Sequence, residues 1–227
     1  METLTETWEY INSHWDRLFD LTWQHVKIIA VANSIAVVLG VIIGIFIAGK
    51  GRERIADIVL YLAGIMMTIP SLALFGLMIY LLPRIGLPGI GFTPAVIALV
   101  LYGQLPIIRN TYTAIRNVDP AMIEAGRGMG MTSGQLLRRV KLPLAMPIIM
   151  AGLRTAIVIN IGIAAIAVFI GAGGLGAPIF NGIVRTRMDL ILSGTIFVSV
   201  LALIFDGGMA LVERWITPKG LKRRQQS

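Results

Sequence analysis

The stretch EAGRGMGMTSGQLLRRVKLP, residues 124–143, decides how the rest of the chain is interpreted. It is basic and rich in glycine, yet long apolar runs stand on both sides of it. Just upstream, Asp119 and Pro120 predict the start of a helix, because Asp accepts hydrogen bonds from free backbone N–H groups and Pro fits the first helical position. Gly130 predicts the end of that helix.

A second short helix is expected to follow the first. Thr132 and Gln135 have the spacing of a capping box, in which each side chain bonds the backbone N–H of the other residue. The helix after them, SGQLLRRVK, is expected to end at Leu142 and Pro143. The stretch is therefore predicted to form two short polar helices with a glycine hinge between them.

The composition of the chain points to a lipid environment. The 227 residues are 56% hydrophobic and 14% charged, whereas soluble domains carry about 25% charged residues. The net charge of +8 would suit nucleic acid, but basic residues beside membrane spans serve as topology signals instead. No nucleic-acid partner is therefore expected. The sequence has no Cys, and its 2 His residues lie near the N-terminus, so no metal centre is expected either.

A helix needs about 20 mostly apolar residues to cross a bilayer, and five apolar runs are long enough. They predict an all-α membrane protein with five transmembrane helices. The transmembrane domain is expected to cover 28–212, with spans at 28–48, 56–82, 93–108, 147–170 and 190–212. The second span is long and is expected to kink at Pro70.

The basic residues are distributed unevenly between the two sides of these spans. One side contains the loop after the first span, the central loop 109–146 and the basic tail 213–227, and it carries Lys50, Arg52, Arg54, Arg109, Arg116, Arg127, Arg138, Arg139, Lys141, Arg214, Lys219, Lys222, Arg223 and Arg224. The other side carries only Arg17, Lys27, Arg84, Arg185 and Arg187. The richer side is cytoplasmic by the positive-inside rule, so the N-terminus is expected outside and the C-terminus inside.

Segment 1–27 has the pattern of an amphipathic helix. Its apolar residues fall near one helical face, and Trp favours the headgroup layer of a membrane: Trp8, Ile11, Trp15, Phe19 and Val26. The segment either lies in the outer membrane interface or packs on the helical bundle as an ordinary terminal helix.

Two glycine-rich matches to nucleotide-binding motifs fail on their context. GAGGLG, residues 171–176, has the Rossmann spacing, but a membrane helix rather than a strand precedes it; a tight turn between two spans is expected instead. GIFIAGKG, residues 44–51, begins like a P-loop, but Gly51 stands where the motif needs a Ser or Thr for magnesium. No cofactor is expected on this chain, and any ATP that drives it must act on another subunit.

The central stretch has two interpretations from its residues alone. It is either a solvated loop whose charges only set topology, or a docking element whose small residues let a partner approach and whose charges pair with it: Ala121, Ala125, Gly126, Gly128, Glu124 and Arg127.

A family resemblance favours docking. Glu124-Ala125, Gly130 six positions after Glu124, and Val140-x-Leu142-Pro143 resemble the EAA loop of ABC importer permeases. Gly126 stands in place of the second Ala of that pattern, and Val140 in place of Ile. The similarity extends over most of the chain, and IPSLALFG, LPIIRNTYTAI and VFIGAGGLG resemble the branch that imports osmoprotectants.

This resemblance implies a type I ABC importer fold similar to that of methionine permeases, in the inner membrane of a bacterium. It implies that the loop docks on an ATPase subunit through Glu124, Ala125, Gly126, Arg127, Gly130, Val140, Leu142 and Pro143. Two ATPase subunits holding ATP and magnesium, a second permease and an extracytoplasmic binding protein would complete the transporter. The implied substrate is a quaternary amine such as glycine betaine, choline or carnitine; another small solute such as methionine stays open.

Polar residues inside the spans are candidates to line the pathway, and Thr68, Ser71 and Asn160 are such residues; bonding between helices is the alternative. Asp57 and Asp206 are expected near the cytoplasmic ends of their spans, with Arg154 extending to the same face. A stand-alone carrier would more often carry a mid-span carboxylate, and a membrane enzyme would need a catalytic set that is not evident in the sequence. We therefore expect a non-catalytic subunit of an ATP-driven transporter.

Overall fold

The computed structural model describes residues 2–216, and every regular element among them is helical. The elements are α1 (Glu2–Ser13), α2 (Trp15–Ile47), α3 (Glu53–Thr68), α4 (Ser71–Leu81), η1 (Leu82–Ile85), α5 (Phe92–Arg116), α6 (Pro120–Gly128), α7 (Ser133–Leu136), η2 (Leu137–Lys141), α8 (Leu142–Ile166), η3 (Ala167–Ile170), α9 (Gly176–Arg185) and α10 (Met188–Ile216). Most of the basic tail predicted at 213–227 lies outside the described residues.

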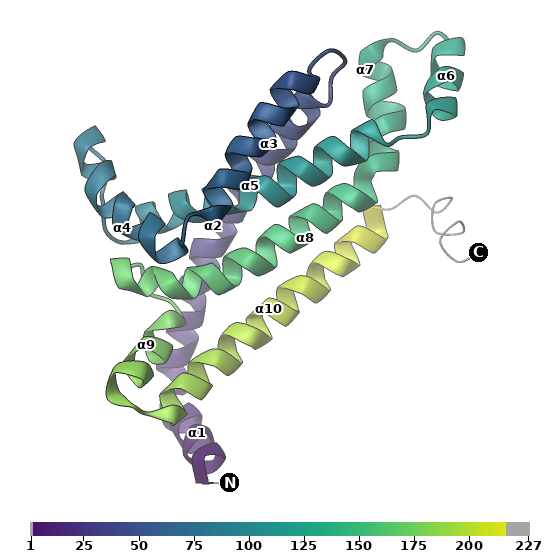
Figure 1. The fold of residues 1–227 in the computed structure, drawn as a ribbon. Helices are drawn as coiled ribbons and strands as arrows, with labels where there is room; N and C mark the ends of the chain where they lie inside the picture. The colour runs from purple at the N-terminus through teal and green to yellow at the C-terminus, as the bar shows by residue number, and fades with distance from the viewer. Residues whose placement is uncertain (1, 217–227) are drawn as a thin grey trace.

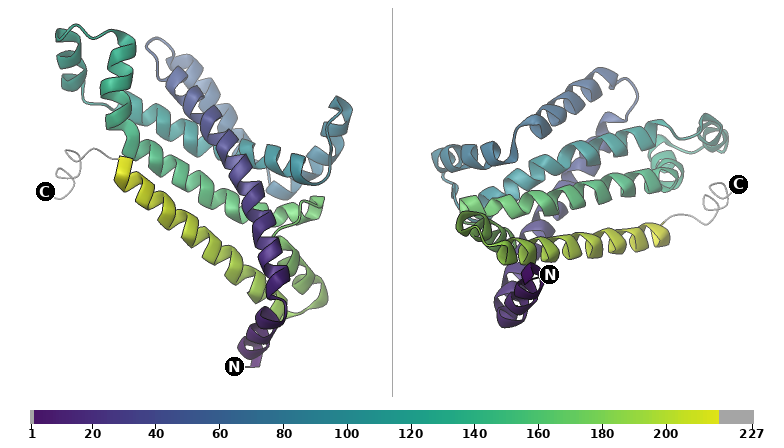
Figure 2. Two further views of the ribbon diagram at one scale, coloured as in Figure 1. Left: turned by 180° about the vertical axis from the view of Figure 1, so that it is seen from behind. Right: turned by 60° about the horizontal axis from the view of Figure 1, so that its bottom comes forward.

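Three long helices, α5, α8 and α10, run beside one another, and α2 crosses them (Figure 1). The short helices α6 and α7 stand at one end of this bundle, whereas α1 and α9 lie at the opposite end, which is also visible from behind (Figure 2). Four helices are long and apolar enough to cross a membrane, and the bent pair formed by α3 and α4 with η1 makes up to five. The predicted all-α membrane fold is confirmed.

Close contact between α2 and α5 depends on two glycines. A Cβ atom at Gly40 would lie 2.6 Å from Cγ2 of Ile107, and one at Gly44 would lie 2.6 Å from Cβ of Thr111. Only a residue without a side chain lets the two backbones approach this closely. Gly40 and Gly44, which have the spacing G-x-x-x-G, therefore allow two helices of the same chain to pack closely.

Buried amides bond the same helices to each other. Nδ2 of Asn160 on α8 donates to Oδ1 of Asn33 on α2 at 2.7 Å and to the carbonyl oxygen of Leu99 on α5 at 3.1 Å. Since an unpaired amide in an apolar interior is costly, these bonds favour one arrangement of α2, α5 and α8.

The second predicted span is broken rather than kinked. Helix α3 ends at Thr68, Ile69 and Pro70 are extended, and the following helix leaves at an angle of 98°. Pro70 lacks the N–H that would continue the helical bonding, and the hydroxyl of Tyr102 on α5 donates to the carbonyl oxygen of Ile69. Leu74 and Phe75 of α4 then pack into the core.

Other helices extend past their predicted ends. The helix that contains the first predicted span begins at Trp15, so segment 1–27 consists of α1 and the start of α2. Helix α5 extends to Arg116. The prediction that Leu142 and Pro143 end the second loop helix is wrong, because α7, η2 and α8 form one rod past Pro143.

A π-turn makes this continuity possible. In a regular α-helix the ring of Pro143 would collide with the carbonyl group of the residue four positions earlier. Residues Leu137–Lys141 adopt π-helical bonding immediately before that proline, which changes the hydrogen-bond register at this point.

Arg154 and Asp206, which the sequence predicts toward the same face, contact each other directly. They form a bidentate ion pair, in which Nε and Nη2 of Arg154 donate to the two carboxylate oxygens of Asp206. The sequence interpretation missed this pair, because the residues are 52 positions apart. The pair joins α8 to α10.

Helix α1 and the start of α2 pack on the bundle and also expose aromatic residues. Ile11 and Leu18 are buried, whereas Trp8 and Trp15 are 65% and 56% exposed. Helix α1 contacts α10, so packing on the bundle is confirmed. Placement of the exposed Trp side chains in a membrane interface stays a prediction.

Candidate functional site

The coupling segment, defined here as residues 119–141, begins with the helix predicted from Asp119 and Pro120. Oδ1 of Asp119 accepts a hydrogen bond from the backbone N–H of Ala121 at 2.9 Å, and Pro120 occupies the first helical position. Both features satisfy the free end of the helix. Helix α6 therefore begins where the sequence predicted.

Gly130 ends α6 by adopting a left-handed conformation with φ of +76°. The N–H of Gly130 donates to the carbonyl oxygen of Arg127 at 2.9 Å, and that of Met131 donates to Gly126 at 3.1 Å. These two bonds form a Schellman motif, for which glycine is the favoured residue. The predicted hinge is thus a bonded corner of defined geometry.

The predicted capping box opens the next helix. Oγ1 of Thr132 accepts from the N–H of Gln135 at 3.3 Å, and Oε1 of Gln135 accepts from the N–H of Thr132 at 2.9 Å. The reciprocal bonds fix the direction in which α7 leaves the corner.

Gly126 holds α6 against the rod that begins with α7. A Cβ atom at Gly126 would lie 2.6 Å from Cδ1 of Leu136 and 3.8 Å from Cγ2 of Val140. Both Gly126 and Leu136 are buried. The expectation that Gly126 offers its small surface to a partner is therefore wrong, because the chain itself covers this residue.

The remaining face of α6 is open. Glu124, Ala125 and Arg127 are exposed, and Met122 and Met129 expose 47% and 70% of their surface. Val140, Leu142 and Pro143 are half-buried along the rod below. Small and flexible apolar residues beside opposite charges form a surface that another protein can approach closely.

Basic side chains gather beneath this face. A pocket between the end of α2 and the coupling segment is lined by Lys50, Arg127 and Lys141. Lys141 experiences the positive charges of Arg127, Lys50 and Arg116. Among the described residues, Glu53 supplies a carboxylate to one of these cations, with its Oε1 3.0 Å from Nη1 of Arg116. The pocket therefore favours an acidic partner. The sequence predicted that these residues lie on one side of the membrane, but only the fold shows that they line the same pocket.

The three residues expected along the pathway lie in different surroundings. Thr68 is exposed at the end of α3, and its hydroxyl donates to the carbonyl oxygen of Ile65 at 2.7 Å. Ser71 is half-buried at the start of α4. These two residues flank the break at Pro70, whereas Asn160 is fully buried between three helices.

Proteins of similar sequence are named as transport permeases. The chain is 44% identical over 217 residues, covering 96% of this chain and 100% of the relative, to the osmoprotectant import permease protein OsmW of Salmonella typhimurium. It is 40% identical over 225 residues, covering 99% and 97%, to the carnitine transport permease protein OpuCD of Listeria monocytogenes. It is 39% identical over 220 residues, covering 96% and 97%, to the choline transport system permease protein OpuBB of Bacillus subtilis.

Solved structures share the fold. An inward-facing form of the MetNI methionine ABC transporter matches with a TM-score of 0.77 at 23% identity, covering 88% of this chain and 96% of that chain. An amino acid ABC transporter crystallised with histidines matches with a TM-score of 0.75 at 22% identity, covering 90% and 96%. The chain therefore has the transmembrane fold of type I ABC importers, as predicted.

The family profile that matches this chain covers residues 40–218, which include the coupling segment and the broken span. The match extends over most of the chain, and the relatives named above align over nearly their whole length. This protein belongs to the family of inner membrane components of binding-protein-dependent transport systems.

Proposed function

We propose that this chain is the permease subunit of an ABC importer and that it forms the pathway for an osmoprotectant, a quaternary amine such as glycine betaine, choline or carnitine. The observation that carries the docking part is the open face of α6 above a basic pocket. The substrate class rests on the names of relatives at 39% to 44% identity. An amino acid such as methionine is less favoured as the substrate, since the methionine transporter of known structure is only 23% identical to this chain.

The coupling segment is the proposed docking site for the ATPase. Glu124, Ala125 and Arg127 would meet the ATPase surface, while Gly126 and Gly130 keep α6 in position on the rod. ATP and magnesium would remain on the ATPase, and this chain would bind no cofactor and catalyse no reaction. Two ATPase subunits would serve one transporter.

The continuous rod gives this docking site a mechanical consequence. Because α7, η2 and α8 form one helical unit, a displacement of the coupling segment moves α8 directly. Helix α8 is bonded to α2 and α5 through Asn160 and to α10 through Arg154. Closure of the ATPase would therefore shift the helices together and switch the access of the pathway.

The break at Pro70 supports a second permease copy and a pathway beside it. Thr68 and Pro70 are exposed in the single chain. Non-helical backbone inside a membrane is tolerated only where protein covers it or water reaches it. We therefore assign Thr68 and Ser71 to the pathway side of the chain, facing a second permease. Asn160 would not line the pathway, but its hydrogen bonds would fix the positions of the helices that form it.

The proposed orientation follows from charge. The coupling segment and the C-terminus would lie in the cytoplasm of a bacterium, and the N-terminus would lie outside the inner membrane. An extracytoplasmic binding protein would then deliver substrate to the end formed by α1 and α9.

Uptake assays test this function. The permease, its ATPase and its binding protein would be reconstituted in proteoliposomes, and uptake of labelled glycine betaine, choline, carnitine and methionine would be compared with and without ATP. ATP-dependent uptake of a quaternary amine is expected. Uptake of methionine alone would refute the substrate class, and uptake without the ATPase would refute the ATP-driven permease.

Glu124→Arg combined with Gly130→Trp tests the docking site in the same system. The pair places a charge reversal on the open face of α6 and a large side chain at its left-handed corner. Loss of the ATPase from the purified complex is expected. Retention of both the ATPase and uptake would show that docking occurs elsewhere.

A further inference from the structure

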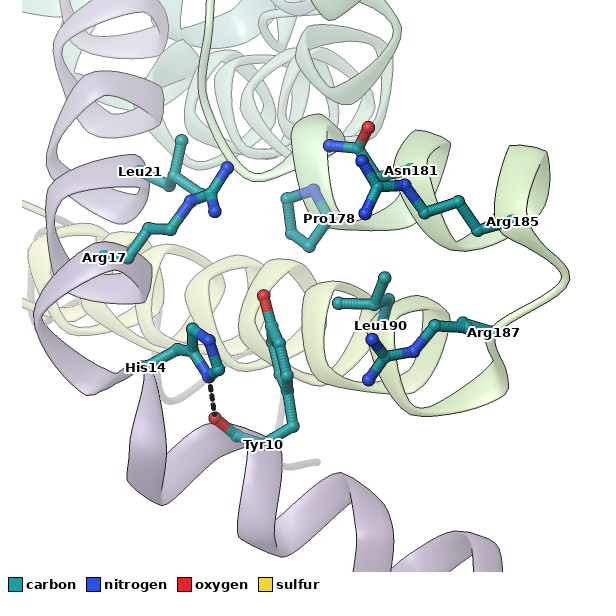
Figure 3. Close-up of a pocket in the computed structure, with 9 residues that line it drawn as sticks. All are labelled: Tyr10, His14, Arg17, Leu21, Pro178, Asn181, Arg185, Arg187 and Leu190. Atoms are coloured by element: carbon teal, nitrogen blue, oxygen red, sulfur yellow. Dashed lines mark hydrogen bonds between the residues drawn. The ribbon is translucent and has the colours of Figure 1, made fainter.

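A pocket at the end of the bundle opposite to the coupling segment has basic and polar walls. It lies between the α1–α2 junction and α9, and its polar lining residues are Tyr10, His14, Arg17, Asn181, Arg185 and Arg187. We call it the outer pocket. The guanidinium groups of Arg17 and Arg185, the amide of Asn181 and the hydroxyl of Tyr10 point toward the same space (Figure 3).

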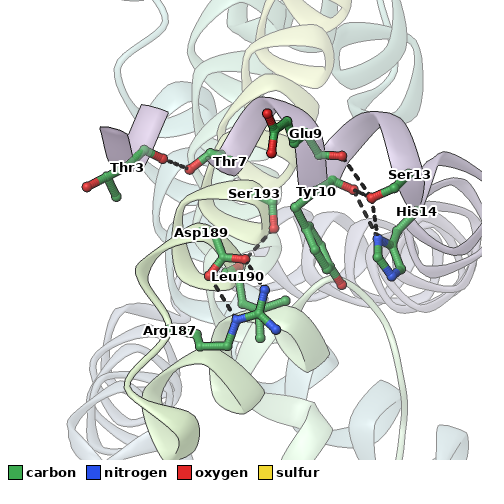
Figure 4. Close-up of polar contacts among 10 residues, drawn as sticks. All are labelled: Thr3, Thr7, Glu9, Tyr10, Ser13, His14, Arg187, Asp189, Leu190 and Ser193. Atoms are coloured by element: carbon green, nitrogen blue, oxygen red, sulfur yellow. Dashed lines mark hydrogen bonds and ion pairs between the residues drawn. The ribbon is translucent and has the colours of Figure 1, made fainter. Parts of the chain in front are cut away.

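Two of these cations are left without a counter-charge. Within residues 2–216, Arg17 and Arg185 form no ion pair with another side chain. Arg187 next to them differs, because Nε donates to Oδ1 of Asp189 at 3.1 Å and Nη2 donates to Oδ2 (Figure 4). These bonds also raise the pKa of the Arg187 guanidinium above its ordinary value. The charge available in the outer pocket is therefore that of Arg17 and Arg185.

The pocket walls are held in place by contacts within the chain. The rings of Tyr10 and His14 are stacked with centroids 4.3 Å apart, and Nδ1 of His14 lies 3.2 Å from the carbonyl oxygen of Tyr10. Pro178 and Leu190 also line the pocket and are buried. This part of the wall is ordered before a ligand enters, which lowers the entropy lost on binding.

A neighbouring cavity on the other side of Tyr10 has the opposite charge. Glu6 and Glu9 line it together with the neutralised pair of Arg187 and Asp189. Two guanidinium groups and a neutral amide suit a carboxylate, which accepts several charge-assisted hydrogen bonds at once. The adjoining carboxylates suit a basic group beside it.

We propose that the outer pocket receives a carboxylate side chain of the extracytoplasmic binding protein and so fixes the position in which that protein delivers its substrate. The assignment rests on the proposed function, because it takes this end of the bundle as the outer one. The family is defined by dependence on a binding protein, and charge complementarity selects an acidic contact on it. Such contacts fix the orientation of a docking protein and speed its association, and reversing the charge of one partner weakens binding through repulsion.

Charge reversal is the first test. The permease and its ATPase would be placed in nanodiscs, and the affinity of the glycine betaine-loaded binding protein would be measured by fluorescence anisotropy. Arg17→Glu with Arg185→Glu should weaken binding by about tenfold or more, since attraction becomes repulsion at two positions. Arg84→Glu, a charge reversal at an exposed arginine on η1, is the control and should bind normally.

Two further variants keep the test decisive. If the reversed pair assembles poorly, Arg17→Gln with Arg185→Gln removes the charge without repulsion and should weaken binding by a smaller factor. A Lys substitution at the acidic contact of the binding protein should restore its affinity for the reversed permease. Unchanged affinity in both arginine pairs would overturn the proposal.

A probe inside the pocket separates the possible occupants. The chain has no Cys, so Asn181→Cys gives a single site for an environment-sensitive fluorophore. The fluorescence should change when the binding protein is added. A saturable change with glycine betaine alone, or a change only in phosphatidylglycerol nanodiscs, would overturn the proposal in favour of a substrate site or a lipid site. If the wild type also neither retains an ATPase nor imports a quaternary amine, the proposed function fails as well.

Discussion

The two glycine-rich segments of this chain differ in what surrounds them. In segment 171–176, three glycines adopt left-handed angles, and a Gln and a His from α2 hold the loop: Oε1 of Gln24 accepts from the N–H of Gly174, and Nδ1 of His25 accepts from that of Leu175. In the coupling segment, Gly130 has open space around it and α6 exposes most of its side chains.

This difference separates a structural loop from a docking surface. Nε2 of His25 also donates to the carbonyl oxygen of Ile161, 3.1 Å away, so the imidazole is neutral and joins α2, α8 and the glycine loop. A side chain added in that loop meets the bundle, whereas one added on α6 meets solvent or a partner. Substitutions in the first segment should therefore affect folding, and those in the second should affect ATPase docking.

The largest effect is expected for Gly174→Val. Gly174 has φ of +85°, and a Cβ atom there would lie 3.0 Å from Nδ1 of His25. Strain and overpacking together should destabilise the fold by about 3 kcal/mol, which thermal unfolding in detergent would detect as a lowered midpoint. Gly128→Val, at a site on α6 with no atom within 4 Å, is the control. Equal midpoints for the two variants would contradict the comparison.

Replacing His25 by Leu should have the next largest effect. The change removes the bond from His25 to the carbonyl oxygen of Ile161 and leaves the N–H of Leu175 without its acceptor on α2, which costs about 2 kcal/mol. Gln24→Leu removes a single bond to the same loop and should lower the unfolding midpoint by less. A His25→Leu protein as stable as wild type would mean that the loop is not held in this way.

Gly130→Ala should have a smaller and local effect. The left-handed angle of +76° costs a residue with a Cβ atom about 1 kcal/mol, so the corner after α6 opens more readily. ATP-driven uptake should fall while the unfolding midpoint of the bundle changes little. Gly134→Ala, at an exposed helical glycine with free space, should leave uptake normal. A lowered midpoint without loss of uptake would reverse the roles of the two segments.

Local signals in the sequence predicted the coupling segment well. The cap at Asp119, the left-handed Gly130 and the Thr132–Gln135 box depend on residues within a few positions of one another, and all three are present. The length and the low charge content of the apolar runs likewise predicted a helical membrane bundle. The tight glycine turn at 171–176 was also predicted correctly.

Features that depend on distant residues were not predictable from one sequence. The ion pair of Arg154 with Asp206 and the bonds from His25 join residues 52 to 150 positions apart. The outer pocket was missed because its residues come from two distant parts of the chain, although Tyr10, His14 and Arg17 share a helical spacing. The continuation through Pro143 was missed because a proline usually ends a helix, and the π-turn that accommodates it has no clear sequence signal.

Accessibility of a single cysteine at Ala125 tests the central claim most directly. Ala125→Cys and, as a control on an exposed loop away from the coupling segment, Leu87→Cys would each be the only Cys in the chain. Maleimide-polyethylene glycol should label both in the permease alone. Addition of the ATPase should block labelling at position 125 and leave position 87 reactive. Equal labelling at position 125 with and without a bound ATPase would contradict docking at α6.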